Sequence, residues 1–196
     1  MISIREAKNI LISVLAISLA ITIATSNEKL GVLTQFQTLP IKISFFAITI
    51  GIGFVLHELA HKFVAMKFGA FAEFKMWPQG LILSLITSVF GFVFVAPGAV
   101  YIYASQITKT QNGLISLAGP LTNLILAFVF LGLEIFFPFK IALGYTPLSL
   151  WLFASKINIW LGIFNMIPIF PLDGSKIMDW NIFVWATVGL IFLIMF

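Results

Sequence analysis

The sequence predicts an all-α polytopic membrane protein with five or six transmembrane helices. Of its 196 residues, 61% are hydrophobic and only 9% are charged, whereas soluble domains carry about 25% charged residues. The mean hydropathy is +1.12, and apolar segments of about 20 residues, the length that crosses a bilayer, recur along the chain. This length suits a single membrane domain over residues 1–196 and leaves no room for a separate soluble sensing domain.

Charge and cysteine content exclude several other classes of protein. The net charge of +4 is spread over loops without a basic run, which indicates membrane orientation and not a nucleic-acid partner. The chain has no cysteine, so disulfides, thiolate metal ligands and a cysteine nucleophile are excluded.

The first two spans follow from the apolar runs near the N-terminus. The first is expected over about Ile10–Ala24; a cleaved signal peptide would look similar, but no small-x-small cleavage site follows it. Residues 26–40 are polar and are expected to form a loop. The second span is expected from Ile41 to Phe68, where Gly69 ends it.

The later elements are punctuated by glycine and proline. Short alternation over 71–80 predicts a strand at the membrane interface, and the apolar stretch 81–103 is broken by Gly91, Pro97 and Gly98. A clear span is expected over 114–137, then a loop over 139–147, a span over 148–170 and a last short span over 181–196.

The stretch VLHELAHKF places His57 and His61, the only histidines of the chain, within the second span. Four helical residues advance about 400° and 6 Å, so both imidazoles share one face and can bind one tetrahedral zinc ion. Glu58 is turned by about 100° and can act as a general base on a water molecule. Alternatively, Glu58 and Lys62 form an i,i+4 ion pair at a helix end. Because ionisable groups within a bilayer are costly and usually functional, the metal site is favoured.

A third ligand must be a carboxylate, since no further histidine or cysteine is present. Glu134 is expected near the opposite end of its span, and Glu73 at the interface. Asp173 follows Pro168 and Pro171, which break the helix, and a broken helix is tolerated at membrane depth where it lines a cavity. Asp173 is therefore the best placed, although Pro-Leu-Asp-Gly alone could be an ordinary interfacial turn.

HELAH in one span and NMIPIFPLDG in a later one together resemble the site-2 protease family of intramembrane zinc metalloproteases, peptidase family M50. The stretch LAGPLTN over 117–123 resembles the middle span of that family's core. The resemblance extends over about 45–180 and implies a three-helix catalytic core over about 41–180. The family often has Asp-Gly-Gly-Arg where this chain has Asp-Gly-Ser-Lys, which concerns the local turn and not the ligand.

The resemblance also implies a role for each matched residue. His57, His61 and Asp173 would bind one Zn²⁺ per chain, Glu58 would be the catalytic base, and Asn165 would hold the substrate backbone or the oxyanion. Asn158 precedes Asn165 by seven residues on the same helix face. It is expected to line the same cavity, unless it joins helices as buried amides also do.

The expected membrane topology follows from the distribution of basic residues and from the number of membrane crossings between His57 and Asp173. With a cytoplasmic N-terminus, seven of the 11 basic residues lie inside, an excess that the positive-inside rule favours. The seven are Arg5, Lys8, Lys62, Lys67, Lys75, Lys109 and Lys176. His57 and Asp173 reach one depth only if their spans run in the same direction, so 81–103 should add no full crossing. We expect a re-entrant element there, a sixth span being the alternative, and an active site towards the cytoplasmic side of the cell membrane.

The expected function is cleavage of a transmembrane helix of a membrane protein substrate within the lipid bilayer, as in regulated intramembrane proteolysis. A membrane zinc transporter is one alternative, but the chain has no second histidine cluster to relay the metal. A metal-binding scaffold without catalysis is another, but zinc binding alone does not require Glu58.

Overall fold

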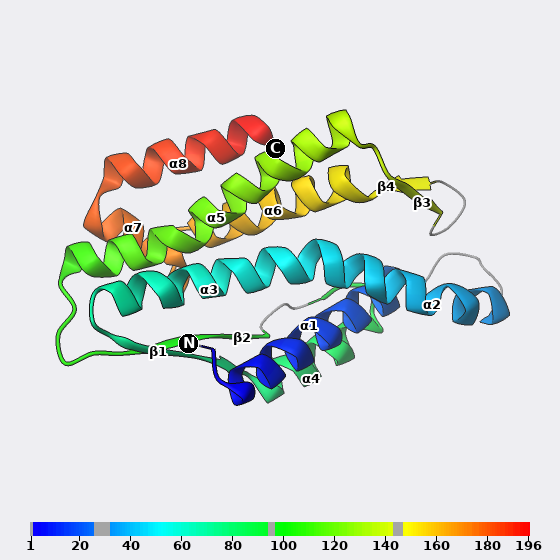
Figure 1. Ribbon diagram of the computed structural model, residues 1–196, viewed down its shortest axis with the longest axis horizontal. Helices are drawn as coiled ribbons and strands as arrows, with labels where there is room; N and C mark the ends of the chain where they lie inside the picture. Colours follow the sequence, from blue (N-terminus) through cyan, green and yellow to red (C-terminus); the bar gives the residue numbers. More distant parts are fainter. Residues whose placement is uncertain (1, 26–31, 94–96, 143–146) are drawn as a thin grey trace.

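The computed structural model describes residues 2–25, 32–93, 97–142 and 147–196, which are mostly helical (Figure 1). Three helices are long and apolar enough to cross a membrane: Ile4–Thr25, Gln37–Lys67 and Lys109–Phe136. Two further apolar helices, α6 (Leu150–Met166) and α8 (Ile182–Met195), have 17 and 14 residues. The helical membrane class is confirmed, and the number of five or six spans stays a prediction.

The first helix, α1 (Ile4–Thr25), begins earlier than the predicted span. Ser3 and Glu6 exchange side-chain hydrogen bonds with each other's backbone N–H groups, at 2.9 and 3.1 Å, and this reciprocal pair caps the helix. Glu6 also forms a buried ion pair with Lys62, and it accepts a hydrogen bond of 3.0 Å from the backbone N–H of Phe74. The start of α1 is thereby tied to the helix that carries both histidines.

That helix is built from three continuous pieces: α2 (Val32–Phe46), the π-helical turn η1 (Ala47–Gly51) and α3 (Ile52–Lys67). The loop expected over 26–40 is therefore wrong from Val32 onwards, while 26–31 lies outside the described residues. Pro40 stands within α2, so the helix continues on both sides of a residue that cannot donate a backbone hydrogen bond. At the other end Gly69 has φ 80° and ends α3, as predicted.

A two-stranded antiparallel sheet follows, formed by β1 (Phe71–Met76) and β2 (Gly98–Tyr103). The strand predicted over 71–80 is confirmed for 71–76 as β1, whereas 78–80 belong to the next helix. Between the strands lie α4 (Pro78–Ser88) and a turn at Gly91, with φ 84°. Since Met76 pairs with Gly98, the chain leaves the sheet and returns to the same end of it, as a hairpin must. Residues 94–96 lie outside the described residues, and the depth of this hairpin in a bilayer stays a prediction.

The second half of the chain starts with α5 (Lys109–Phe136), capped by Thr108 and Gln111. Next comes a short hairpin of β3 (Lys140–Ala142) and β4 (Pro147–Ser149), where a loop was expected. Three-residue strands are too short to leave a periodic pattern in the sequence. After α6 the chain forms α7 (Asp173–Trp180) and then α8, which packs against α6 and α7.

Helices α3, α5 and α6 lie side by side and form the centre of the molecule (Figure 1). At one end of it, on the left of Figure 1, α3 ends, α5 begins, and β1 and α7 lie close together. These elements carry five of the basic residues assigned to the inner side: Lys62, Lys67, Lys75, Lys109 and Lys176. These basic residues thus gather at one end of the molecule, and the cytoplasmic orientation of that end stays a prediction.

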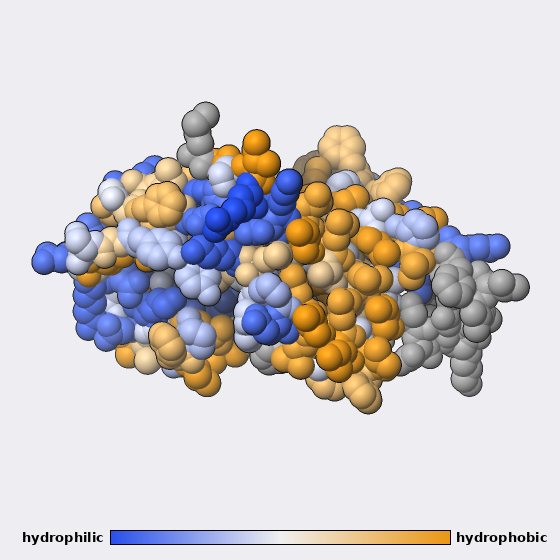
Figure 2. Space-filling view, turned by 90° about the horizontal axis from the view of Figure 1, so that it is seen from below, coloured by the Kyte–Doolittle hydropathy of each residue, from blue (hydrophilic) through white to orange (hydrophobic). Residues whose placement is uncertain are grey.

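The outer surface also has an apolar half and a hydrophilic half. Figure 2 shows apolar side chains gathered over the half that bears α1 and α4, and hydrophilic ones towards the half with β1 and the N-terminus. On α1 and α4 the exposed apolar residues include Leu11, Leu15, Ile82 and Ile86. A contiguous apolar surface of this kind suits contact with lipid.

Candidate metal centre and active site

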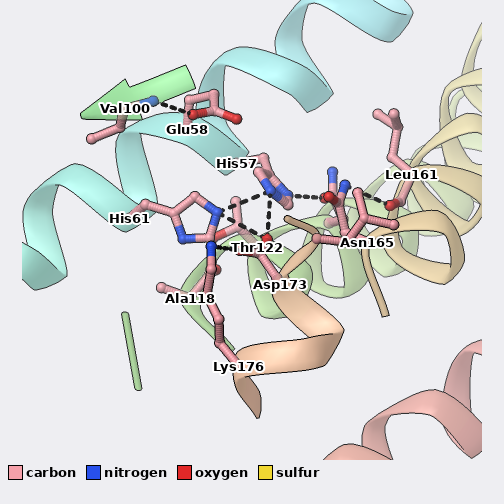
Figure 3. Close-up of polar contacts among 12 residues, drawn as sticks. His57, Glu58, His61, Val100, Ala118, Thr122, Leu161, Asn165, Asp173 and Lys176 are labelled. Atoms are coloured by element: carbon pink, nitrogen blue, oxygen red, sulfur yellow. Dashed lines mark hydrogen bonds and ion pairs between the residues drawn. The ribbon is translucent and has the colours of Figure 1, made fainter. Parts of the chain in front are cut away.

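Three ligand atoms converge where α3 meets the start of α7 (Figure 3). The Nε2 atoms of His57 and His61 are 3.0 Å apart. Asp173 Oδ2 lies 3.2 Å from the first and 3.1 Å from the second. All three residues are buried, so the helical spacing of the histidines and the broken helix before Asp173 do bring these side chains together.

Both imidazoles have their other nitrogen hydrogen-bonded to α5. His57 Nδ1 is 2.6 Å from Asn123 Oδ1, and His61 Nδ1 is 2.7 Å from the backbone oxygen of Ile115. Both partners are oxygen acceptors, so each Nδ1 donates its proton and each Nε2 presents a lone pair. Two lone pairs and a carboxylate oxygen within 3.2 Å of one another would repel, unless a cation lies among them.

The donor set fits a zinc ion. Bonds of 2.0 to 2.2 Å in a tetrahedron place neighbouring ligand atoms roughly 3.3 Å apart, close to the 3.0 to 3.2 Å found here. Three protein ligands are typical of a catalytic zinc, whose fourth position is left for water or substrate. Among the residues that the structure describes, this is the one group of histidine and carboxylate side chains arranged to hold a metal.

Glycine allows α5 to pass directly beside the ligand atoms. A methyl group added at Gly119 would lie 2.5 Å from His57 Nε2 and 2.5 Å from His61 Nε2, well inside van der Waals contact. Gly119 belongs to the LAGPLTN stretch, and its hydrogen side chain is what leaves room for the metal centre.

A second glycine positions Asp173 at the start of α7. A methyl group on Gly174 would lie 2.2 Å from the backbone oxygen of Met166, so α7 can pack against the end of α6 only with glycine there. Ser175 donates a hydrogen bond of 2.8 Å to the backbone oxygen of Leu172, and Lys176 Nζ lies 3.7 Å from Asp173 Oδ1. The Ser-Lys departure thus leaves the turn intact and puts a cation beside the carboxylate.

Glu58 lies next to the histidines but is directed towards the sheet (Figure 3). Its Oε2 accepts a hydrogen bond of 2.8 Å from the backbone N–H of Val100 in β2. The side chain is half-buried and lines the same cavity as the metal ligands. Lys62, its partner in the alternative i,i+4 pair, forms an ion pair with Glu6. Strand β2 therefore fixes the carboxylate beside the site.

A cavity of about 530 Å³ opens onto the three ligand atoms. Its walls include strand β2, one face of α6 and the turn before α7. The lining includes five aromatic side chains, those of Phe54, Trp77, Tyr101, Trp160 and Phe164. Asn165 also lines it, and its Nδ2 donates a hydrogen bond of 3.0 Å to the backbone oxygen of Leu161.

The expectation that Asn158 lines this cavity is wrong. Its side chain is fully buried, with 0% exposure, and it bonds Asn123 of α5 at 2.9 Å. It is one of the buried amides that join helices. Sequence reasoning also missed Asn123 and Ile115 as partners of the histidines; an asparagine inside a membrane span was the available signal for Asn123.

The other acidic residues after Glu58 lie away from the metal centre. Glu134 accepts a hydrogen bond from Ser149 at the far end of α5. Asp179 is exposed and pairs with Lys109 at 3.0 Å. Glu73 lies 3.4 Å from Arg5. Each of these carboxylates has its own partner, which leaves Asp173 as the carboxylate at the site.

Sequence comparisons with known proteins identify the family of this chain. The sequence model described as Peptidase family M50 matches residues 134–189. A Methanocaldococcus jannaschii protein assigned as a zinc metalloprotease is 46% identical over 191 residues, 95% of this chain and 90% of the relative. One from Bacillus subtilis is 34% identical over 155 residues, 69% of this chain and 68% of the relative.

A further zinc metalloprotease of Methanocaldococcus jannaschii is 35% identical over 125 residues, 63% of this chain and 30% of the relative. No solved structure gave a match. A relative at 46% identity over nearly the whole of both chains, together with the match to the family's sequence model, leaves one conclusion: the chain belongs to peptidase family M50, the site-2 proteases, and is a zinc metalloprotease.

Proposed function

We propose that this protein is an intramembrane endopeptidase that cuts a transmembrane helix of other membrane proteins. The observation that carries the proposal is the place of the metal centre. Two of its ligands lie on a helix long and apolar enough to span a membrane, and the centre opens into a cavity rich in apolar side chains. A site of this kind admits peptide bonds that come from within the bilayer.

His57, His61 and Asp173 hold the zinc in this proposal. When bound there, zinc supplies Lewis-acid polarisation of the scissile carbonyl and lowers the pKa of a water molecule towards about 7. Glu58 takes the proton of the attacking water and delivers it to the leaving amine. Since Glu58 Oε2 is hydrogen-bonded to the backbone N–H of Val100, we assign the proton transfer to Oε1.

Asn165 binds the substrate backbone or the oxyanion in the same proposal. One hydrogen of its amide is used by the Leu161 oxygen. The second hydrogen and the side-chain carbonyl can therefore serve a bound peptide, and the residue lines the cavity that holds the ligands. This arrangement supports the role of Asn165 in binding a peptide.

A helical substrate must unwind before it can be cut, because its amides are engaged in i→i−4 hydrogen bonds. Strand β2 offers a surface for the unwound stretch, since five consecutive residues, Gly98–Ile102, line the cavity. Their backbone pairs with β1 on one edge, and the other edge faces the site through the Val100 N–H. An extended peptide laid there would run beside Glu58.

The proposed location is the cell membrane, with the N-terminus and the active site towards the cytoplasm. Five of the inner basic residues cluster on elements at the end of the molecule where α3 ends and α7 begins (Figure 1), as the positive-inside rule requires for that side. Asp173 lies at this same end, so water can reach it from the cytoplasm without crossing the apolar surface.

The competing functions lack support among the described residues. Transport of zinc needs a series of sites across the membrane, whereas one ligand group is present in that part of the chain. A scaffold needs no half-buried carboxylate beside the metal, yet Glu58 is held there by β2.

The deciding experiment replaces Glu58 by glutamine, which keeps the shape and removes the base. Glu58→Gln should bind zinc nearly as well as wild type, yet cleave a membrane-helix substrate about 10² to 10⁴ times more slowly. His57→Ala should lose both properties. Glu134→Gln is the matched control: it makes the same chemical change at the far end of α5 and should keep both.

Cleavage by Glu58→Gln at the wild-type rate would refute the role of the base, provided that His57→Ala is inactive in the same assay. Loss of zinc from Glu58→Gln would instead make Glu58 a ligand. Zinc uptake into proteoliposomes without cleavage would favour the transporter.

A further inference from the structure

A chain of hydrogen bonds runs from α6 through α5 to the metal ligand on α3. Asn158 Nδ2 donates to the backbone oxygen of Ala154 at 2.8 Å. Asn123 Nδ2 donates to Asn158 Oδ1 at 2.9 Å, and Asn123 Oδ1 lies 2.6 Å from His57 Nδ1. Asn123 and Asn158 are both 0% exposed, so water does not compete for these bonds.

All hydrogen bonds of this series are donated in the same direction, which is determined by the acceptor at its far end, the Ala154 carbonyl. The Ala154 carbonyl can only accept, so the amide of Asn158 must direct Nδ2 to it and Oδ1 to Asn123. That oxygen also only accepts, so Asn123 must direct its Nδ2 there and its own Oδ1 to His57. His57 is then obliged to carry its proton on Nδ1, which leaves the lone pair on Nε2.

A second acceptor reinforces the orientation of Asn123. Its Nδ2 also donates to the backbone oxygen of Gly53 at 3.3 Å, so both amide hydrogens have acceptors. The packing is close as well, because a methyl group on Gly53 would lie 2.7 Å from Asn158 Oδ1. Asn158 therefore has little freedom to rotate away from Asn123.

The two histidines differ in how they are held. His61 Nδ1 bonds a backbone carbonyl, Ile115 O, at 2.7 Å, and that group cannot reverse its polarity. His57 bonds a side-chain amide, which can turn over and offer N–H instead of oxygen. Only His57 needs another residue to fix the polarity of its partner.

We propose that Asn158 is a positioning residue of the metal centre: it acts through Asn123 to fix the tautomer and ring orientation of His57. The proposal rests on His57 being a zinc ligand. Partners that orient metal ligands contribute 10- to 100-fold to metal affinity, and Asn158 stands one step further away. We therefore expect its loss to weaken zinc binding by about 10-fold.

The test compares three variants by zinc affinity, measured by competition with a chelator in detergent. Asn158→Ala removes the shorter-range of the two acceptors of the Asn123 amide and should weaken zinc binding about 10-fold. Asn158→Asp keeps an oxygen towards Asn123 and should bind zinc within about twofold to threefold of wild type, a smaller loss than the alanine variant shows.

Ser155→Ala is the matched control, because Ser155 is also buried on α6. It donates a hydrogen bond of 2.8 Å to the Ala127 oxygen of α5, whereas the partner of His57 Nδ1 is Asn123. It should lower the melting temperature without changing the affinity for zinc.

Nuclear magnetic resonance of the zinc-loaded protein gives a second readout. With ¹⁵N-labelled histidine the ring signals come from only two imidazoles, since the protein has two histidines, and each ring contributes one Nδ1–H group. In Asn158→Ala the His57 Nδ1–H should shift and exchange faster with water. The His61 Nδ1–H, bonded to Ile115, should stay unchanged and serves as an internal reference.

The positioning role of Asn158 is refuted if Asn158→Ala binds zinc as tightly as wild type, or if Ser155→Ala weakens zinc binding equally. An unchanged His57 Nδ1–H signal in Asn158→Ala would overturn it too. A wild-type protein that binds no zinc would remove the basis of both proposals. A protein that binds zinc but cuts no peptide would refute the proposed protease function without contradicting the positioning role of Asn158.

Discussion

Gly119→Ala should abolish tight zinc binding, although it adds a single methyl group to a helix. The added carbon would lie 2.5 Å from the Nε2 atoms of both His57 and His61, whereas non-bonded atoms of this size rest about 3.5 Å apart. At least one imidazole must therefore move by about 1 Å. A zinc site tolerates about 0.2 Å in its ligand distances, so a ligand would be lost.

We expect zinc affinity to fall by at least about 100-fold, or about 2.8 kcal/mol, in a chelator competition assay on the purified protein. Gly132→Ala is the control on the same helix, because an added methyl there meets nothing within 4 Å. Alanine is a better helix former than glycine by about 0.5 to 1 kcal/mol, so Gly132→Ala should keep its zinc and melt no lower. Wild-type zinc affinity in Gly119→Ala would show that α5 does not pass the ligands this closely.

The remaining predictions concern the third ligand, the topology and the tie to α1. Asp173→Ala should insert into the membrane but lose most of its zinc on metal analysis; full occupancy would refute the three-ligand site. Single cysteines at Lys75 and Lys109 should be labelled from the same side of the membrane by an impermeant thiol reagent, since β1 and β2 pair; labelling from opposite sides would mean a full crossing between them. Glu6→Ala should cost about 3 to 5 kcal/mol, seen as a lower melting temperature, because it breaks a buried ion pair and removes the acceptor of the Phe74 N–H. Arg5→Ala breaks a pair whose arginine is 70% exposed and should cost less than about 1 kcal/mol; equal losses would contradict the importance of the buried pair.

The parts of the site that sequence predicted are those fixed by local geometry. His57 and His61 share a face because four helical residues bring them there, whatever surrounds the helix. Asp173 was recognised because prolines break the helix before it, and this effect also acts within a few residues. The strand β1 could be predicted from its alternation for the same reason.

What sequence could not show depends on contacts between distant segments. The hydrogen bond of Asn123 to His57 joins residues 66 positions apart, and the ion pair of Lys62 with Glu6 joins residues 56 apart. Strand β2 was hidden in an apolar stretch because its residues gain their pattern only by pairing with β1. Asn158 was wrongly expected to line the cavity, because sharing a helix face with Asn165 does not show how deeply a side chain is buried.

The π-helical turn η1 determines how the metal face of α3 is rotated relative to α2. A π-turn closes i→i+5 hydrogen bonds, one residue wider than an α-turn, and each residue rotates a helix by about 100°. Thr49 supports the wider turn, since its Oγ1 donates to the Phe45 oxygen at 2.9 Å. A π-turn takes up one residue more than an α-turn without ending the helix, so η1 lets α2 and α3 continue in nearly the same relative rotation. Removing one residue from the regular part of α3 before His57 would leave an equally apolar helix, yet it would swing His57 about a quarter turn away from Asp173. The angular setting of the metal face thus depends on the number of residues that precede it in the helix, a quantity that the hydropathy of the span does not reveal.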